Sequence, residues 1–432
     1  MSQADWDRLQ YYSQKVKFFE SISEDDPRVH PSTYFRIGHL WSSSLFPSLR
    51  GLHYRLNEMS ISHIFLHLSP LLDSLTLDNI GGFENTVVGP FLATLSSSPQ
   101  MVRRIVLNTT EQMSVEVLKK SFIQFKQLRS LELSGAVFMT NFSLFEVLGT
   151  LPSLENLTFV ANNPASRPTP RPTPVPENQN SQSGGPKYFE ALESLRVTGS
   201  FFLIRRLLGF ISSPCLKSIE VLPVISQVRD EHEAEELLTP SMTIVASKWS
   251  QSLKNFVISS RSFDAKRHEF SKLAIIFKDL HNMETFRVDW RMKSWEDLKS
   301  LLRSWPKLRT LNLNQTFFTF SSLALIAENC PQLRYLHIRL STSTIPPFPS
   351  KSLCHNLEVL TVGEGYRDRS AQTTLECQIK MARHLDLIFP CLKSLEVQSE
   401  DVFWLGIRDL IRLCQDAGRS RVESSGRQQI SS

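Results

Sequence analysis

A short apolar pattern, L-x-x-L-x-L, recurs along most of the chain. The first clear copy comprises Leu49, Leu52 and Tyr54, and the thirteenth begins at Leu392. Most successive copies begin 23 to 30 residues apart, and three larger gaps of 35 to 38 residues interrupt the series. Apolar positions that return at such a regular interval predict structural repeats rather than one compact domain.

Each copy predicts a short strand, and the segment that follows it predicts a helix. Alternate residues of a strand point to opposite sides, so the last two apolar residues of a copy point inward and the residue between them points outward. The segment 321–329 has helical spacing, with Leu323 and Ile326 on one face. Prolines such as Pro306 and Pro331 stand two residues before the next copy and stop the helix. The pattern therefore predicts an α/β fold, a leucine-rich-repeat solenoid (horseshoe) with a parallel inner sheet, outer helices and about 13 repeats.

The same pattern divides the chain into regions. Residues 1–47 precede the repeats and are expected to form an N-terminal helical cap, with an amphipathic helix over 2–20. The repeats occupy 48–416, and the Pro-rich segment 161–187 within them is expected to be a disordered insert. Residues 417–432 are polar and predict a disordered tail.

Two further inserts explain the other long gaps between copies. The acidic run 230–236 fits a solvated loop, and the segment 363–369, rich in glycine and charge, fits a second loop.

Composition excludes several classes of protein. The chain has 48 Lys and Arg against 43 Asp and Glu, and a net charge of +5 is too small to indicate nucleic-acid binding. Six cysteines without C-x-x-C pairs indicate neither a zinc module nor a disulfide framework and fit a reducing compartment. The N-terminus lacks the apolar region of a signal peptide, and no apolar run reaches membrane-spanning length. We therefore expect a cytoplasmic and/or nuclear protein that engages neither nucleic acid nor membrane.

Catalytic and cofactor-binding motifs are missing from the sequence. It contains no G-x-G-x-x-G, P-loop, G-x-S-x-G or H-E-x-x-H motif, so we expect no enzymatic activity, no cofactor and no metal. His63 and His67 stand four residues apart in an expected helix, but two ligands are too few for a metal site, and a structural role is favoured.

The outward positions of the strands line the concave face of the predicted horseshoe. Side chains that form hydrogen bonds are densest in the ninth to eleventh copies, where Asn314 also lies. Arg and Tyr are common anchors of protein interfaces. We predict a protein-binding site formed by Arg287, Asp289, Asn312, Tyr335, His337 and Arg339. A solvated strand surface is the other interpretation of the same residues.

The repeats resemble those of F-box/leucine-rich-repeat proteins. The run Cys330-Pro-x-Leu333-x-x-Leu336-x-Ile338 is similar to their cysteine-containing repeats. The segment 5–17, Asp-Trp-Asp-Arg-Leu-Gln-Tyr-Tyr-Ser-Gln-Lys-Val-Lys, followed by Phe-Pro-Ser-Leu at 46–49, resembles the region after the F-box in fungal members of the mushroom type. An F-box itself, with its Leu-Pro-x-Glu opening, is not detectable in this chain.

This resemblance implies a non-enzymatic module similar to the substrate-binding region of an F-box subunit of a ubiquitin ligase. The implied partners are a protein substrate and, only if an F-box exists upstream, the adaptor of the ligase. The alternative is a stand-alone leucine-rich-repeat scaffold or interaction protein unconnected to ubiquitin.

Overall fold

The structure is a computed structural model of the protein. The residues that it describes are 3–21, 44–56, 61–81, 85–97, 102–110, 115–135, 142–161, 187–224, 231–259, 272–289, 295–341, 347, 353, 355–363, 374–397 and 402–430.

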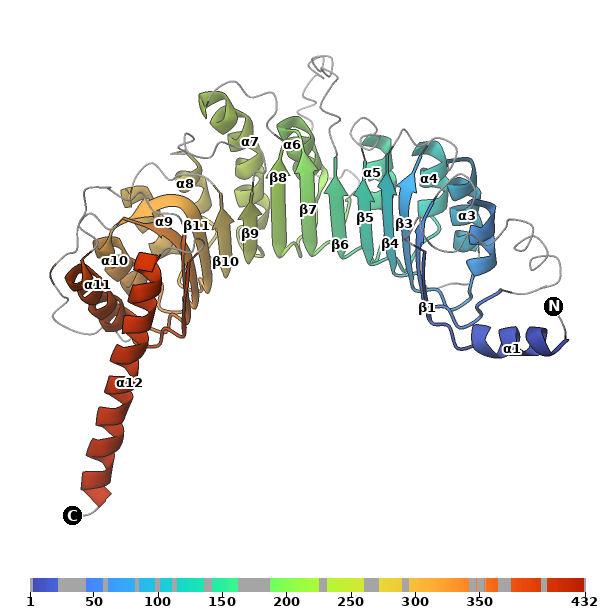
Figure 1. The fold of residues 1–432 in the computed structure, drawn as a ribbon. Coiled ribbons are helices and arrows are strands. Elements are labelled where there is room, and N and C mark those ends of the chain that lie inside the picture. Colours follow the sequence, from blue (N-terminus) through green and yellow to red (C-terminus); the bar gives the residue numbers. More distant parts are fainter. Residues whose placement is uncertain are drawn as a thin grey trace. The chain divides into compact units, whose positions relative to one another are not determined.

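The chain forms two compact units that share one building plan. The first comprises Met1–Leu216 and Leu222–Val224, and the second comprises Lys217–Val221 and Ile225–Ser432. In both, a short strand is followed by a helix that returns the chain to the start of the next strand (Figure 1). Each unit is an α/β leucine-rich-repeat solenoid, which confirms the predicted fold class.

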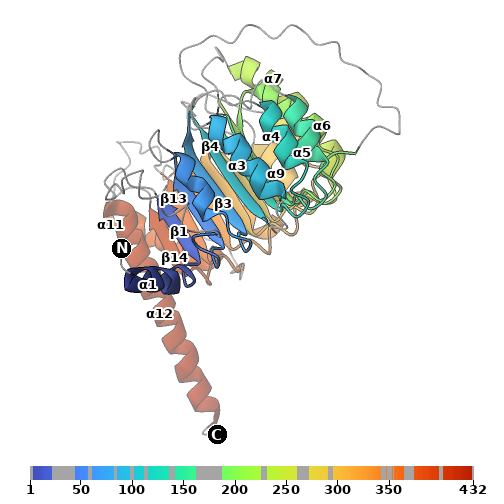
Figure 2. The same cartoon turned by 90° about the vertical axis from the view of Figure 1, so that its right-hand side faces the viewer.

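In the first unit the strands lie in chain order, and neighbouring strands from β1 to β7 pair in parallel. The strands are β1 (Phe18–Ser21), β2 (Gly51–Arg55), β3 (Ser74–Ile80), β4 (Arg104–Thr109), β5 (Ser130–Ser134), β6 (Asn156–Val160) and β7 (Ser194–Gly199). The helices are α1 (Gln3–Ser13), the 3-10 helix η1 (Ile61–His67), α3 (Asn85–Ser97), α4 (Val115–Phe122), α5 (Phe142–Gly149) and α6 (Phe201–Phe210). Helices α3, α4 and α5 lie along the same face of the sheet (Figure 2).

The second unit repeats this arrangement with parallel strands in chain order. Its strands are β8 (Ser218–Pro223), β9 (Asn255–Ile258), β10 (Thr285–Val288), β11 (Thr310–Phe318), β12 (Tyr335–Leu340), β13 (Val359–Gly363) and β14 (Ser394–Val397). Its helices are α7 (Glu231–Trp249), α8 (Lys272–Phe277), α9 (Trp295–Ser304), α10 (Phe320–Asn329), α11 (Leu375–Ile388) and α12 (Val402–Ile430). Helix α10 coincides with the helix predicted over 321–329.

The recurring apolar template sets the register of the strands. The middle apolar residue of each copy pairs with its counterpart on the next strand, as Leu311 does with Phe286 on one side and Leu336 on the other. These side chains are buried beneath the helices, whereas the residue between the two strand leucines lies on the opposite face. We call this second face, which the helices leave uncovered, the open face of the sheet.

The start of the chain differs from the predicted helix over 2–20. Helix α1 ends at Ser13, and β1 pairs in parallel with β2, so the sheet begins one strand earlier than the template. Phe19 explains the difference, because its ring stacks on Phe46 and Tyr54 with centroid distances of 5.7 and 6.3 Å. An extended backbone places this ring in the aromatic cluster at the end of the core.

Two segments predicted to be irregular are helical. The acidic run 230–236 was expected to be a loop, but Glu231 begins α7. Glutamate and alanine favour helices, and acidic side chains in the first turn interact well with the helix dipole. The predicted disordered tail 417–432 is also contradicted over most of its length, because α12 continues to Ile430. This stretch contains no proline, so a helix nucleated by the preceding residues can propagate through it.

The other predicted inserts lie largely outside the described residues. Of the Pro-rich insert 161–187, only its two end residues are described, and of the segment 363–369 only Gly363 is described.

Candidate functional site

Three neighbouring strands of the second unit bring the predicted site residues together on the open face. The register pairs Arg287 of β10 with Asn312 of β11, and Asn312 with His337 of β12. The flanking leucines and phenylalanine of these strands are buried on the other face, which turns the polar residues outward. The predicted placement is therefore confirmed for this row, and the binding role assigned to it stays a prediction.

Asp289 lies directly after β10 and is fixed by its neighbours. Its backbone N–H donates to the carbonyl of Ile258 at 3.1 Å, and the hydroxyl of Ser259 donates to its Oδ2 at 2.5 Å. The Nε atom of Arg287 lies 3.6 Å from the other carboxylate oxygen, Oδ1. The Asp289 side chain is only 14% exposed, so this carboxylate is largely removed from water.

Strand β11 contains a bulge that the sequence analysis missed. Pairing with β12 is regular up to Leu313 and Ile338, and then Phe317 pairs with Arg339. Asn314 therefore does not occupy the position expected for it, because residues 314–316 are inserted between the two registers. The sequence signal was the run of three polar residues between Leu313 and Phe317, which breaks the alternation of a regular strand.

The bulge brings an aromatic ring to the site. The guanidinium carbon of Arg339 lies 5.7 Å from the centroid of Phe317, within cation–π range. Phe317 is 37% exposed, and Tyr335 at the start of β12 is 48% exposed. Two accessible aromatic rings thus flank the polar row, and only Tyr335 was among the predicted residues.

The centre of the site holds several buried polar atoms without a hydrogen-bond partner among the described residues. They are Asp289 Oδ1, Asn312 Oδ1, Asn314 Oδ1 and His337 Nε2. Most buried polar atoms in folded proteins have a partner, and leaving one unsatisfied costs about 1–3 kcal/mol. The ion pair with Arg287 at 3.6 Å compensates Asp289 Oδ1 in part, so the energetic cost that an external hydrogen-bonding group can relieve rests mainly on Asn312, Asn314 and His337.

Burial keeps His337 neutral at neutral pH. Desolvation is the largest cause that lowers the pKa of His337 from its usual 6.5, and the positive charge of Arg287 lowers it further. Asp289 and Glu396 oppose this change, but the pKa stays lowered. A neutral imidazole offers one donor and one acceptor, so the ring can form hydrogen bonds without an added charge. We call Arg287, Asp289, Asn312, Asn314, Phe317, Tyr335, His337 and Arg339 the polar patch.

The histidine pair of the first unit has a structural role. The Nδ1–H of His67 donates to the carbonyl of His63 at 3.1 Å, and the His67 ring lies 4.4 Å from that of Phe19. Burial lowers the pKa of His67 to about 4, so the ring is neutral. Within the described residues, no group of three or more His, Cys, Asp or Glu side chains could hold a metal ion.

None of the helices in the described part of the chain is both long and apolar enough to span a membrane.

Comparison with known proteins gives similarity in structure only. No protein-family model matches the sequence, and no curated protein matches it. The crystal structure of the Rad7 and Elc1 complex in yeast is similar with a TM-score of 0.42 and 11% identity, over 92% of this chain and 92% of that chain.

Two other solved structures show a comparable likeness. The TLR13–ssRNA13 complex has a TM-score of 0.38 and 14% identity, and the match covers 74% of this chain but only 40% of that chain. The leucine-rich-repeat-containing protein LegL7 from Legionella pneumophila has a TM-score of 0.37 and 13% identity, over 76% of this chain and 92% of that chain. At these identities the similarity concerns the path of the backbone and says nothing of a shared ligand.

Proposed function

We propose that the chain is a non-enzymatic protein-recognition module and that the polar patch of the second unit binds its protein partner. The observation that carries this proposal is the set of buried polar atoms at the centre of the patch that lack partners within the described residues. A solvated strand surface has no need to bury such atoms, because water satisfies exposed ones.

The chemistry of the patch indicates what the partner presents. Three of the four atoms are carbonyl or carboxylate oxygens, so the centre of the patch requires donors such as backbone N–H groups or a basic side chain. Arg287 and Tyr335 lie at the margin, where the side chains are 47% and 48% exposed. These residue types are frequent interface anchors because they combine apolar contact with a polar tip.

The link to ubiquitin is the finer part of the proposal. It rests on the resemblance of the repeats and of residues 5–17 to F-box/leucine-rich-repeat proteins. In this form the patch selects the substrate of a ubiquitin ligase, and an F-box encoded upstream recruits the adaptor. Co-precipitation of the adaptor with the product of the complete gene tests this part, and absence of the adaptor leaves a recognition module unconnected to ubiquitin.

The binding role of the patch is tested by affinity capture with quantitative mass spectrometry. The full chain is compared with a triple variant in which Arg287→Ala, Tyr335→Ala and Arg339→Ala remove the large side chains of the patch. We expect partners captured by the wild-type chain to fall at least about tenfold with the variant, as loss of interface anchors commonly costs more than about 1.4 kcal/mol.

A matched control removes the same residue types elsewhere. Tyr12, Arg206 and Arg412 are exposed and lie outside the patch, so the corresponding triple alanine variant should capture the same partners as the wild type. Circular dichroism and thermal unfolding establish that both variants fold. Equal capture by the patch variant and the control variant would refute the assignment of the patch.

A further inference from the structure

The second residue of the apolar template carries a charge in every one of the thirteen copies. In the second unit these residues are Lys217, Lys254, Glu284, Arg309, Arg334, Glu358 and Lys393. Each stands immediately before a strand, and backbone hydrogen bonds align them. The N–H of Arg334 donates to the carbonyl of Arg309 at 2.8 Å, and the N–H of Glu358 donates to the carbonyl of Arg334 at 2.9 Å. The starts of the strands therefore carry a continuous row of charges, which we call the charged edge.

Most side chains of the charged edge form ion pairs with neighbours of opposite charge in the same row. The Nζ atom of Lys254 lies 2.9 Å from a carboxylate oxygen of Glu284. Glu358 lies between two cations, with Arg334 Nη1 at 3.6 Å and Lys393 Nζ at 3.0 Å. Alternation of sign along neighbouring strands is favourable, because like charges directly opposite each other repel.

The alternation fails where two cations stand next to each other, at Lys217 and Lys254 and again at Arg309 and Arg334. Within the described part of the chain, no carboxylate oxygen lies within the 4.0 Å ion-pair distance of the Arg309 guanidinium. Among the residues that the structure describes, Arg334 has Glu358 as its carboxylate partner, and Lys393 shares this carboxylate. Arg309, Arg334 and Lys393 therefore surround Glu358, while Glu284 on the preceding strand pairs with Lys254 and acts on Arg309 only at longer range.

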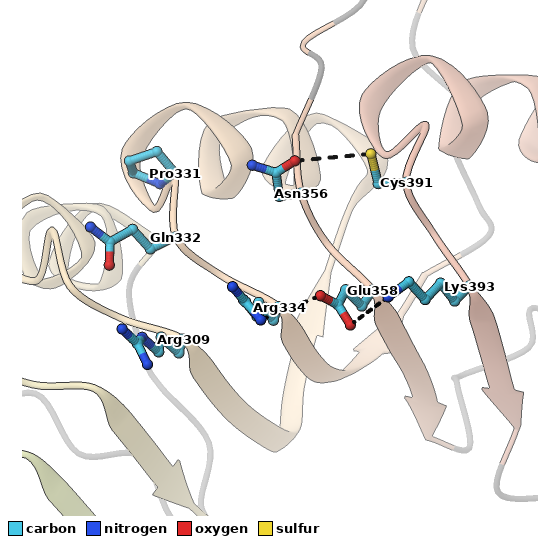
Figure 3. A pocket seen from close by; sticks show the side chains of 8 residues that line it. All are labelled: Arg309, Pro331, Gln332, Arg334, Asn356, Glu358, Cys391 and Lys393. Atoms are coloured by element: carbon cyan, nitrogen blue, oxygen red, sulfur yellow. Dashed lines mark hydrogen bonds and ion pairs between the residues drawn. The ribbon is translucent and has the colours of Figure 1, made fainter.

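A pocket of about 510 Å³ opens at the same place. Its polar lining consists of Arg309, Gln332, Arg334, Asn356, Glu358 and Lys393. Figure 3 shows the charged side chains in a row along the starts of neighbouring strands, with the amides of Gln332 and Asn356 above them. The volume is within the range of about 300–1,000 Å³ that is typical of ligand sites.

We propose that this pocket binds an oxyanion, a carboxylate or a phosphoryl group, carried by a side chain of a polypeptide. The guanidinium groups of Arg309 and Arg334 are planar forks that donate paired hydrogen bonds to such oxygens. The amides of Gln332 and Asn356 add donors beside them. From Arg309 the charged edge continues along the starts of the preceding strands to Glu284 and Lys254, so residues that flank the anion on a bound chain meet further charges on that side. The pocket shares no residue with the polar patch, although Arg334 directly precedes Tyr335, and the proposal stands whether or not that patch binds a partner.

The test uses the full chain and three short fluorescent peptides of identical neutral sequence, with serine, glutamate or phosphoserine at the centre. We expect fluorescence polarisation to show at least about tenfold tighter binding of the phosphoserine peptide than of the serine peptide, because charge-assisted hydrogen bonds are roughly twice as strong as neutral ones. Tight binding of the glutamate peptide as well assigns the site to carboxylates in general, and binding of phosphoserine alone assigns it to phosphoryl groups.

Cysteine alkylation locates the bound peptide. Cys391 lines the pocket and is exposed, whereas Cys215 is exposed outside it. Burial raises the pKa of Cys330 to about 12, so this thiol is an unreactive internal reference. The anionic peptide should slow the reaction of Cys391 with N-ethylmaleimide and leave that of Cys215 unchanged.

Three variants separate the proposal from a general effect of charge. Arg309→Gln combined with Arg334→Gln should abolish the preference for the anionic peptides. Lys254→Gln removes a cation from the charged edge outside the pocket and should leave the preference intact. Glu358→Gln removes the carboxylate that competes for Arg334 and Lys393 and should tighten binding by about threefold or more.

The result that overturns the proposal is equal affinity for all three peptides. An unchanged preference in the double arginine variant, or weaker binding in Glu358→Gln, overturns it as well. The substituted side chains of Arg334 and Lys254 are 58% and 48% exposed in the wild type, so surface substitutions here should not unfold the chain.

Discussion

The imidazole of His53 is joined to the carboxylate of Asp78, with 2.6 Å between Nε2 and Oδ2. Asp78 also accepts a hydrogen bond from the amide of Asn108 at 2.5 Å, and the other imidazole nitrogen of His53 lies 3.1 Å from Glu20. These four residues come from β1, β2, β3 and β4, so the interactions run across consecutive strands of the first unit.

Asp78 is expected to contribute most to this network. Asp78→Ala removes the acceptor for both His53 and Asn108, and we expect a loss of about 1–3 kcal/mol in the free energy of unfolding. Glu20→Ala should cost less than about 1 kcal/mol, because the Glu20 side chain is 63% exposed. Urea unfolding of both variants shows which one loses more free energy of unfolding. An equal loss would show that burial does not set the strength of these interactions.

The first unit should lose stability in mild acid because of His67. Its folded pKa of about 4 lies below the ordinary 6.5, so protonation favours the unfolded state. The contribution of neutral His67 to the free energy of unfolding is therefore complete above pH 6.5. It is lost as the pH falls toward 4, and the loss reaches up to about 3 kcal/mol.

The measurement for His67 is the dependence of the free energy of unfolding on pH in wild type and in His67→Gln. The variant cannot titrate at this position, so its stability should fall less steeply between pH 6.5 and 4. Identical slopes for the two proteins would exclude His67 as the cause.

The core of a repeat is tested at Leu311. Its side chain is fully buried, so Leu311→Ala should reduce the free energy of unfolding by about 2–5 kcal/mol. Its neighbour Thr310 is partly exposed on the open face, and Thr310→Ala should change stability by less than about 0.5 kcal/mol. Chemical denaturation followed by circular dichroism compares them, and similar losses would contradict the assignment of the two faces.

The polar residues that serve binding in the polar patch should lower the stability of the fold. Asn312 has a buried Oδ1 without a partner among the described residues, so Asn312→Leu should raise the free energy of unfolding by about 1 kcal/mol and weaken partner capture. Asn79 provides the contrast, because it donates to the carbonyl of Leu56 at 3.0 Å and has a positive φ of 59°. Asn79→Leu should therefore destabilise the chain, since leucine is strained at such a φ. Destabilisation by both substitutions would argue that Asn312 is an ordinary structural residue.

The sequence predicted the features that the repeated template determines. Strand positions and register follow from leucines such as Leu311 and Leu336, because a parallel ladder of identical templates has one favourable alignment. The row formed by Arg287, Asn312 and His337 could be predicted for the same reason.

Departures from repetition were the features that the sequence analysis missed. The position of Phe317 beside Arg339 depends on how three extra residues fold out of β11, and the template contains no information about this. The strand at Phe19 was missed because it lacks the template and forms through aromatic packing against Phe46 and Tyr54. The charged edge was visible in the sequence, but its significance depends on which charges become neighbours and whether a pocket lies beside them.

The bulge in β11 also bears on how a partner finds its place. A surface made of nearly identical units offers a ligand several equivalent alignments, each displaced by one unit from the next. The insertion of residues 314–316 gives one location a shape and chemistry that its neighbours on β10 and β12 lack. A ligand that fits the bulge has a single alignment. An irregularity in one strand therefore gives a repetitive surface one position that differs from all the others.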